Sequence, residues 1–85
     1  MNRYAYVYFM AAEPEIIRET VPRHVAYWKN LDLSGYIGGP FADRSGGLII
    51  FSAPDSATAE GLVLHDPFQK AGVIDKHWLK EWLPE

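Results

Sequence analysis

The alternation in residues 4–10 constrains the fold of this chain more than any other feature. One side of the pattern carries three tyrosines and Met10, and the other side carries Ala5, Val7 and Phe9. A repeat of two residues that is rich in aromatic and β-branched side chains predicts a β-strand. Because both faces of this strand are largely apolar, we expect both to be covered in the folded protein.

Length and composition limit what else the chain can be. The 85 residues leave room for one core, so we expect residues 1–85 to form a single domain. The lack of cysteine excludes disulfides, thiolate metal ligands and a cysteine nucleophile. A hydrophobic content of 48% excludes disorder, and a net charge of -3 argues against nucleic acid as a partner. With neither a long apolar run nor a signal-peptide pattern, we expect a cytoplasmic protein that does not bind membranes.

A long helix is predicted for residues 14–33. Pro14 suits its first turn, and Ser34-Gly35 suits its end. Its apolar stripe comprises Ile17, Val21, Trp28 and Leu31. Pro22 lies inside the helix, so we expect either a kink or a break near Thr20.

The remaining pattern completes a recognisable order of elements. We predict strands at 35–41, 48–52 and 73–83, a helix at 57–64 and a short helical turn within 66–72. The order β-α-β-β-α-β matches the ferredoxin-like α+β fold, a four-stranded antiparallel sheet with two helices on one face. The other face would expose either the tyrosines of the first strand or their alternates, together with tryptophans of the last strand. Such a patch predicts a homodimer through the open face of the sheet.

His24 is the residue that least fits its surroundings. It lies three residues after Val21 and four before Trp28, in the middle of the apolar stripe, where a leucine would pack. A buried imidazole needs a polar partner or a cavity. One interpretation is a satisfied core histidine. The other is a general acid or base, because histidine changes its charge near neutral pH.

Asp66 is the second candidate and also has two interpretations. Before Pro67 it suits the N-cap of a short helix, with Gln69 three residues later and Gly72 at the end. A carboxylate can cap with one oxygen and orient an imidazole with the other. No serine of the chain lies in a nucleophile-elbow pattern, which disfavours acyl-enzyme hydrolysis.

The other polar residues give weaker signals. His65 and His77 are interpreted as ordinary surface residues, and the three histidines lack metal-ligand spacing, so we expect no metal. Gly38-Gly39-Pro40 lacks the features of a phosphate loop. The glycines either bend a strand or leave room for a ligand beside His24.

Two segments together resemble a known family. The segments Pro22-Arg23-His24-Val25-Ala26-Tyr27 and Asp66-Pro67-Phe68-Gln69-Lys70-Ala71-Gly72 are similar to the motifs of the YCII-related domain (YciI-like) family. The resemblance covers nearly the whole chain. It implies a dimeric α+β barrel protein in which His24 and Asp66 form a His-Asp dyad in a pocket near the sheet. It also implies elimination chemistry, of lyase or dehydrochlorinase type, on small ring compounds.

The leading hypothesis is therefore a small cofactor-free enzyme. His24 would abstract a proton, Asp66 would hold its ring, and the substrate would contact Gly38, Gly39, Pro40, Phe68 and Trp28. The alternative is a non-catalytic module that binds a small metabolite or a partner, because small α+β domains host many functions. Cofactor-independent oxygenation, suggested by fold relatives alone, ranks last.

Overall fold

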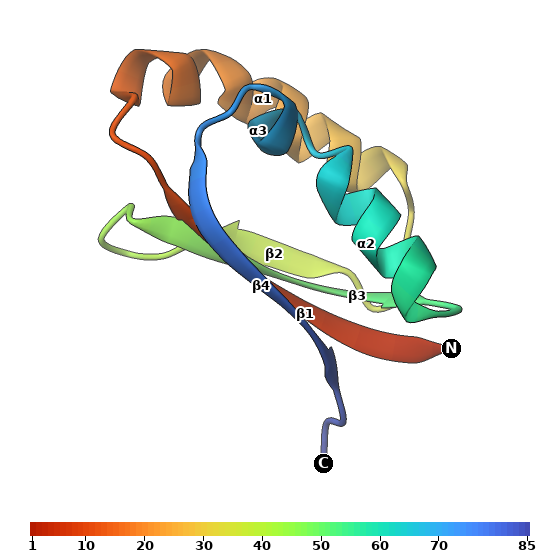
Figure 1. The fold of residues 1–85 in the computed structure, drawn as a ribbon. Coiled ribbons are helices and arrows are strands. Elements are labelled where there is room, and N and C mark those ends of the chain that lie inside the picture. Colours follow the sequence, from red (N-terminus) through yellow and green to blue (C-terminus); the bar gives the residue numbers. More distant parts are fainter.

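The structure, a computed structural model, describes residues 1–85. Its elements are β1 (Asn2–Met10), α1 (Pro14–Asn30), β2 (Ile37–Pro40), β3 (Gly46–Ala53), α2 (Ser56–Leu64), α3 (Pro67–Lys70) and β4 (Ile74–Trp82). The strands form one antiparallel sheet in the order β2-β3-β1-β4, and the helices cover one of its faces (Figure 1). This is the ferredoxin-like α+β arrangement that the sequence predicts.

Helix α1 differs from its prediction in two respects. It runs without interruption through Pro22, so the predicted alternative of two helices is wrong. Proline removes only one backbone donor, and packing of the inner face against the sheet holds the helix on both sides of it. The helix ends at Asn30, before the predicted Leu33, and Asp32 takes a left-handed φ of 50°.

The inner face of α1 also differs from the predicted stripe. Its buried side chains are Thr20, His24 and Trp28, spaced by four residues, whereas Val21 is 40% exposed. Thr20 can be buried because its hydroxyl donates to the carbonyl of Ile16 at 2.7 Å. His24 therefore lies between a satisfied threonine and a tryptophan, and it points toward the sheet.

The structure shows which of the two rows of side chains on β1 faces the helices. Tyr4, Tyr6 and Tyr8 are all buried and belong to one core with Trp28 of α1 and Phe51 of β3. The tyrosines are therefore not part of the open face, which carries the side chains that alternate with them along the strand: Ala5, Val7 and Phe9. This choice places the hydroxyl of Tyr8 on the same side of the sheet as His24.

The opposite face of the sheet carries large apolar side chains. Val7 of β1 pairs with Leu48 of β3 on one side and with Trp78 of β4 on the other. Trp78 and Trp82 are 47% and 44% exposed, and Ile37 of β2 is 67% exposed. None of the three helices has both the length and the apolar composition that crossing a membrane requires.

Strand β2 forms one edge of the sheet and is shorter than predicted. It ends at Pro40, which pairs with Gly47 of β3. An edge strand tolerates proline because the missing N–H can face solvent. At the start of β3, a side chain on Gly46 would overlap the backbone carbonyl of Tyr8, so glycine is required for β3 to approach β1 this closely.

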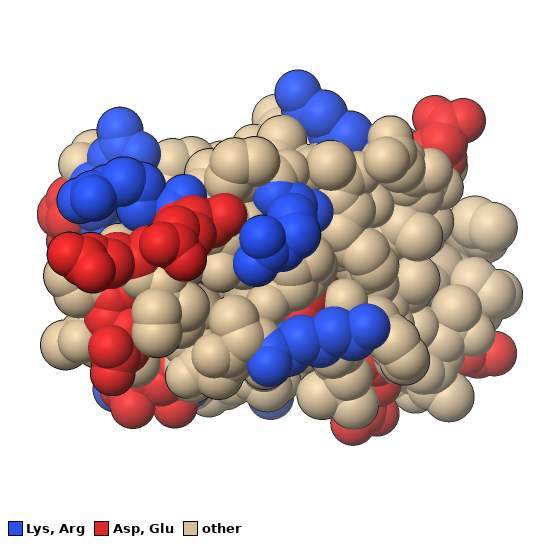
Figure 2. Space-filling view, turned by 90° about the horizontal axis from the view of Figure 1, so that it is seen from above, with Lys and Arg blue, Asp and Glu red and all other residues tan.

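The second half of the chain follows its prediction closely. Helix α2 begins after Asp55, whose carboxylate accepts the backbone N–H of Thr58 at 2.7 Å. Helix α3 begins after Asp66, whose side chain accepts the backbone N–H of Phe68. Figure 2 shows the helix-covered face, on which the two kinds of charge are interspersed: red acidic and blue basic side chains lie side by side at the end where α1 begins, and further blue and red side chains stand across the rest.

Candidate functional site

The candidate site is built around Asp66, which is 0% exposed. Its Oδ1 accepts the backbone N–H of Phe68 at 2.9 Å, and its Oδ2 accepts the indole N–H of Trp28 at 3.0 Å. Nδ1 of His24 lies 2.8 Å from Oδ1 and 3.0 Å from Oδ2. A buried carboxylate is tolerated only when donors satisfy its oxygens, and three donors converge here.

These contacts assign the proton of the His24 ring. An ionised carboxylate can only accept hydrogen bonds, so Nδ1 of His24 carries a proton and donates it. In the neutral imidazole Nε2 is then the acceptor. The Nε2 atom lies 3.4 Å from the hydroxyl of Tyr8, which stands on β1. The two interpretations of Asp66 are thus compatible in one side chain, which caps α3 and contacts the imidazole.

Aromatic rings hold the imidazole in place. Phe68 stacks on His24 with ring centroids 4.0 Å apart and an interplanar angle of 19°. Tyr8 meets the imidazole edge-on at 5.7 Å. His24 itself is 8% exposed, so only a small part of its surface reaches solvent. A ring fixed by packing and hydrogen bonding needs little reorganisation when it exchanges a proton.

The phenol of Tyr8 remains protonated in this environment. Burial raises its pKa above the ordinary value, and the negative charge of Asp66 raises it further. The same two causes raise the pKa of Tyr36, which stands across the site in the segment before β2. Both hydroxyls are therefore neutral hydrogen-bond donors at physiological pH.

One hollow lies beside the imidazole, and a second hollow shares two of its lining residues. The first, of about 210 Å³, is lined by His24, Tyr8, Val25, Lys29, Tyr36, Gly38, Gly39, Pro40 and Ile49. The second, of about 160 Å³, is lined by Phe68, Tyr8, Met10, Ile17, Val21, Pro40, Arg44 and Gly46. Tyr8 and Pro40 line both hollows. We refer to the two hollows together as the His24 cleft.

The structure brings most of the predicted residues together, with one difference. Gly38 and Pro40 reach the cleft, and a side chain on Gly38 would lie 3.1 Å from the hydroxyl of Tyr36, so its absence keeps the first hollow open. Trp28, predicted to contact a substrate, is 0% exposed and lines neither hollow. Its indole N–H is bonded to Asp66, so in this structure Trp28 supports the carboxylate and does not form a wall of the cleft.

Several residues of the cleft were not singled out from the sequence. Tyr8 was considered only as a member of one of the two rows of side chains on the first strand, either of which could face the open side of the sheet. Gly47 leaves the space that the Tyr8 ring occupies, because its Cβ would lie 2.6 Å from Cζ of Tyr8. Lys29 and Arg44 carried no sequence signal, since isolated surface cations are common. The packing of α1 on the sheet brings Lys29 to the site, and the loop between β2 and β3 brings Arg44.

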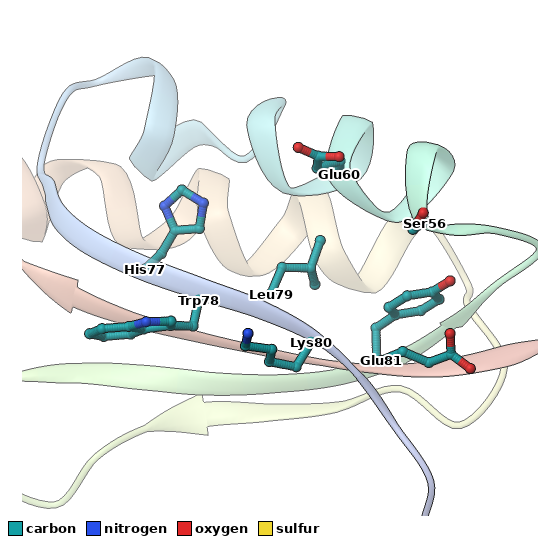
Figure 3. Close-up of a pocket in the computed structure, with 8 residues that line it drawn as sticks. Ser56, Glu60, His77, Trp78, Leu79, Lys80 and Glu81 are labelled. Atoms are coloured by element: carbon teal, nitrogen blue, oxygen red, sulfur yellow. The ribbon is translucent and has the colours of Figure 1, made fainter.

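A larger groove lies elsewhere, between α2 and β4. Its volume is about 410 Å³, and it is lined by residues that include Ser56, Glu60, His77 and Glu81 (Figure 3). His77 is exposed and contacts Gln69 at 3.3 Å, and it has no carboxylate partner. No group of three His, Asp or Glu side chains converges anywhere in a way that could hold a metal ion. His24, whose imidazole contacts a buried carboxylate, is therefore the histidine best placed for proton transfer, although the His24 cleft is smaller than this groove.

Comparison with known proteins identifies the family. A family model of the YCII-related domain matches residues 1–83. The chain belongs to the YCII-related domain family. This membership agrees with the resemblance seen in the segments around His24 and Asp66.

Solved structures agree with the fold of this YCII-related domain. It superimposes on 5-chloro-2-hydroxyhydroquinone dehydrochlorinase (TftG) from Burkholderia phenoliruptrix AC1100, in complex with 2,5-dihydroxybenzoquinone, with a TM-score of 0.83. The identity is 20%, over 95% of this chain and 93% of that one. An antibiotic biosynthesis monooxygenase matches with a TM-score of 0.64 and 14% identity, over 99% of this chain and 100% of that one. No curated protein matches the sequence. At these identities the matches establish the shared ferredoxin-like fold.

Proposed function

We propose that this YCII-related domain is a small enzyme that removes a proton from a small ring compound, with dehydrochlorinase-like elimination as its reaction. His24 is the general base, and Asp66 fixes the tautomer and orientation of its ring. The observation that carries the proposal is the fully buried carboxylate of Asp66, which contacts Nδ1 and so leaves Nε2 as the acceptor.

The chemistry needs only groups that the chain supplies. In the keto tautomer of a chlorinated hydroxy ring, the carbon that bears chlorine also carries a hydrogen. Nε2 of His24 accepts the proton of a ring hydroxyl group, the electron pair of the broken O–H bond forms a carbonyl, the adjacent ring double bond shifts toward the chlorine-bearing carbon, and chloride leaves with the electrons of the carbon–chlorine bond. The imidazolium formed is stabilised by the adjacent carboxylate of Asp66. The neutral hydroxyl of Tyr8, which lines both hollows, donates a hydrogen bond to the oxygen on which negative charge develops. The proton then passes from Nε2 to solvent, which restores the base.

The structural match to a dehydrochlorinase supports this choice of reaction class. The test measures chloride released from 5-chloro-2-hydroxyhydroquinone by the purified protein and by two matched variants. His24→Gln keeps a polar side chain but removes the base, and it should reduce turnover by about 100-fold or more while the ligand 2,5-dihydroxybenzoquinone still binds. His77→Gln makes the same change at an exposed histidine outside the cleft and should retain the parent rate.

Two results would contradict this proposal. Turnover by His24→Gln at the parent rate would exclude His24 as the base. Binding of the quinone without chloride release above the uncatalysed rate would favour the non-catalytic binding module instead.

We also propose that a second copy of the chain covers the open face of the sheet. Trp78 and Trp82 of β4 are nearly half exposed there, and Leu48 of β3 and Ile37 of β2 are exposed on the same face. Water-exposed apolar patches of this kind are rare on monomers, and a two-fold axis lets one patch cover itself. Sedimentation equilibrium should give a dimer for the parent and a monomer for Trp78→Lys. A monomeric parent at micromolar concentration would refute the arrangement.

A further inference from the structure

We propose that the substrate of this site is an anion, and that Lys29 and Arg44 determine this specificity by binding its negatively charged oxygens at the two ends of the His24 cleft. The inference rests on the proposed function, because it concerns the molecule on which His24 acts. It adds a substrate class, a small planar ring that is ionised at neutral pH.

The two cations belong to different hollows of the cleft. Lys29 lies in the last turn of α1 and lines the hollow that contains His24. Arg44 lies in the loop between β2 and β3 and lines the hollow that contains Phe68. Tyr8 and Pro40 line both hollows, so each cation lines a hollow that Tyr8 also lines. A bound ring that contacts Tyr8 can therefore be approached by a cation from each hollow.

Neither cation is neutralised within the chain. The ion pair of the structure joins His24 to Asp66, and neither Lys29 nor Arg44 takes part in one. The residues that line the two hollows include no Asp or Glu. Asp66 is 0% exposed and contacts three donors, so it is not free to pair with either cation. The lining of the cleft thus carries two cations and no acidic side chain, beside the buried and already bonded carboxylate of Asp66, in a protein whose net charge is -3.

This local field suits the proposed chemistry as well as binding. Removing a proton from a ring compound places additional negative charge on its oxygens, and fixed cations stabilise that charge as it develops. The walls supplied by Tyr8, Phe68 and Tyr36 provide aromatic surface for a flat ring. The ligand class that fits both features is an acidic ring compound with ionised oxygens on opposite edges, as in a dihydroxyquinone, or an aryl carboxylate.

The experiment compares two probes that share a ring but differ in charge. 2,5-Dihydroxybenzoquinone is a doubly vinylogous acid and ionises at neutral pH, whereas 2,5-dimethoxybenzoquinone is neutral. Dissociation constants are measured by isothermal titration calorimetry for the parent, Lys29→Met, Arg44→Gly and the double variant. Arg44 has a left-handed backbone with φ of 65°, which glycine adopts readily, so Arg44→Gly is expected to fold. Arg18→Met removes a cation from the exposed side of α1, outside both hollows, and serves as the control.

Each single variant should bind the anionic probe about three- to tenfold more weakly, the double variant more weakly than either, and Arg18→Met within about twofold of the parent. Added salt should weaken binding by the parent more than by the double variant. The neutral probe should bind weakly and equally to all forms. Parent-like binding of the anion by the double variant, or no preference of the parent for the anion, would overturn the inference.

Turnover distinguishes this inference from the proposed function. With 5-chloro-2-hydroxyhydroquinone, a phenol that is largely uncharged at neutral pH, the two cations act on the charge that develops as the proton leaves. Lys29→Met and Arg44→Gly should therefore lower kcat/KM by about three- to tenfold, whereas His24→Gln should lower kcat by about 100-fold with the affinity retained. Parent-like binding of the anionic probe and parent-like kcat/KM in both cation variants, beside a lost kcat in His24→Gln, would refute the charge selectivity alone. Parent-like kcat in His24→Gln beside weaker binding of the anionic probe by the cation variants would refute the base alone.

Discussion

Replacing Asp66 by asparagine should destabilise the protein strongly although the two side chains have nearly the same shape. Each carboxylate oxygen accepts a hydrogen bond from a donor that has no other acceptor. Oδ1 accepts from the backbone N–H of Phe68, and Oδ2 accepts from the indole N–H of Trp28. An asparagine places its NH2 group at one of these two positions. Either rotamer therefore turns a donor toward another donor in a fully buried site.

The size of the effect follows from these contacts. A buried donor left without an acceptor costs about 1–3 kcal/mol. The bonds that remain lose their ionised acceptor, and charge-assisted bonds are about twice as strong as neutral ones. Together these losses predict a decrease of about 2–4 kcal/mol in the free energy of unfolding. A chain of this length has a total of about 4–13 kcal/mol, so the expected loss is a large share of the total.

The assay is urea unfolding followed by tryptophan fluorescence, with Asp55→Asn as the matched control. Asp55 caps α2 through the N–H of Thr58, and asparagine caps a helix as well as aspartate does. The control should therefore be nearly as stable as the parent. Equal stability of Asp66→Asn and Asp55→Asn would refute the view that Asp66 is a fully committed acceptor.

Three further predictions concern the same site. Burial raises the pKa of Tyr6 and Tyr8, whereas tyrosines of the unfolded chain ionise near pH 10. The contribution of these phenols to the free energy of unfolding should therefore be fully present below about pH 10. Above that pH the free energy of unfolding should fall by about 1.4 kcal/mol per pH unit for each phenol. Urea titrations at about pH 9 to 11 should show a smaller slope for Tyr6→Phe. Gly47→Ala should lower the free energy of unfolding by about 1–3 kcal/mol because the new methyl group overlaps the Tyr8 ring. Gly39→Ala should leave the free energy of unfolding unchanged because the space around its Cβ is open. Equal unfolding midpoints of the two variants would contradict this prediction. His24→Leu should lower the free energy of unfolding by about 1–3 kcal/mol because Asp66 loses a partner, and an unchanged value would show that the imidazole contributes no net stability.

The local part of the site could be predicted from the sequence because it depends on neighbouring residues. The cap formed by Asp66 before Pro67 and the glycine at position 72, with φ of +72°, follow from rules that involve only a few residues. The conflict between His24 and its apolar stripe was also visible as a pattern of spacing. For the same reason the order of strands and helices, and with it the ferredoxin-like fold, could be predicted from periodicity together with the caps, prolines and glycines that end the elements.

The tertiary structure decided the features that depend on distant segments. Which face of β1 meets the helices cannot be read from a strand that is apolar on both sides, and this choice brought Tyr8 to 3.4 Å from Nε2 of His24. The inner row of α1 includes Thr20 instead of Val21, because packing against the sheet sets the rotation of the helix. The role of Trp28 changed from a wall of the pocket to a donor to Asp66, a contact between residues 38 positions apart. The sequence by itself determined the elements and singled out His24 and Asp66 as candidate site residues. Contacts between remote segments determined the cleft, its charge and the partners of the imidazole, because side-chain contacts across a sheet and between helices exist only after the chain has packed.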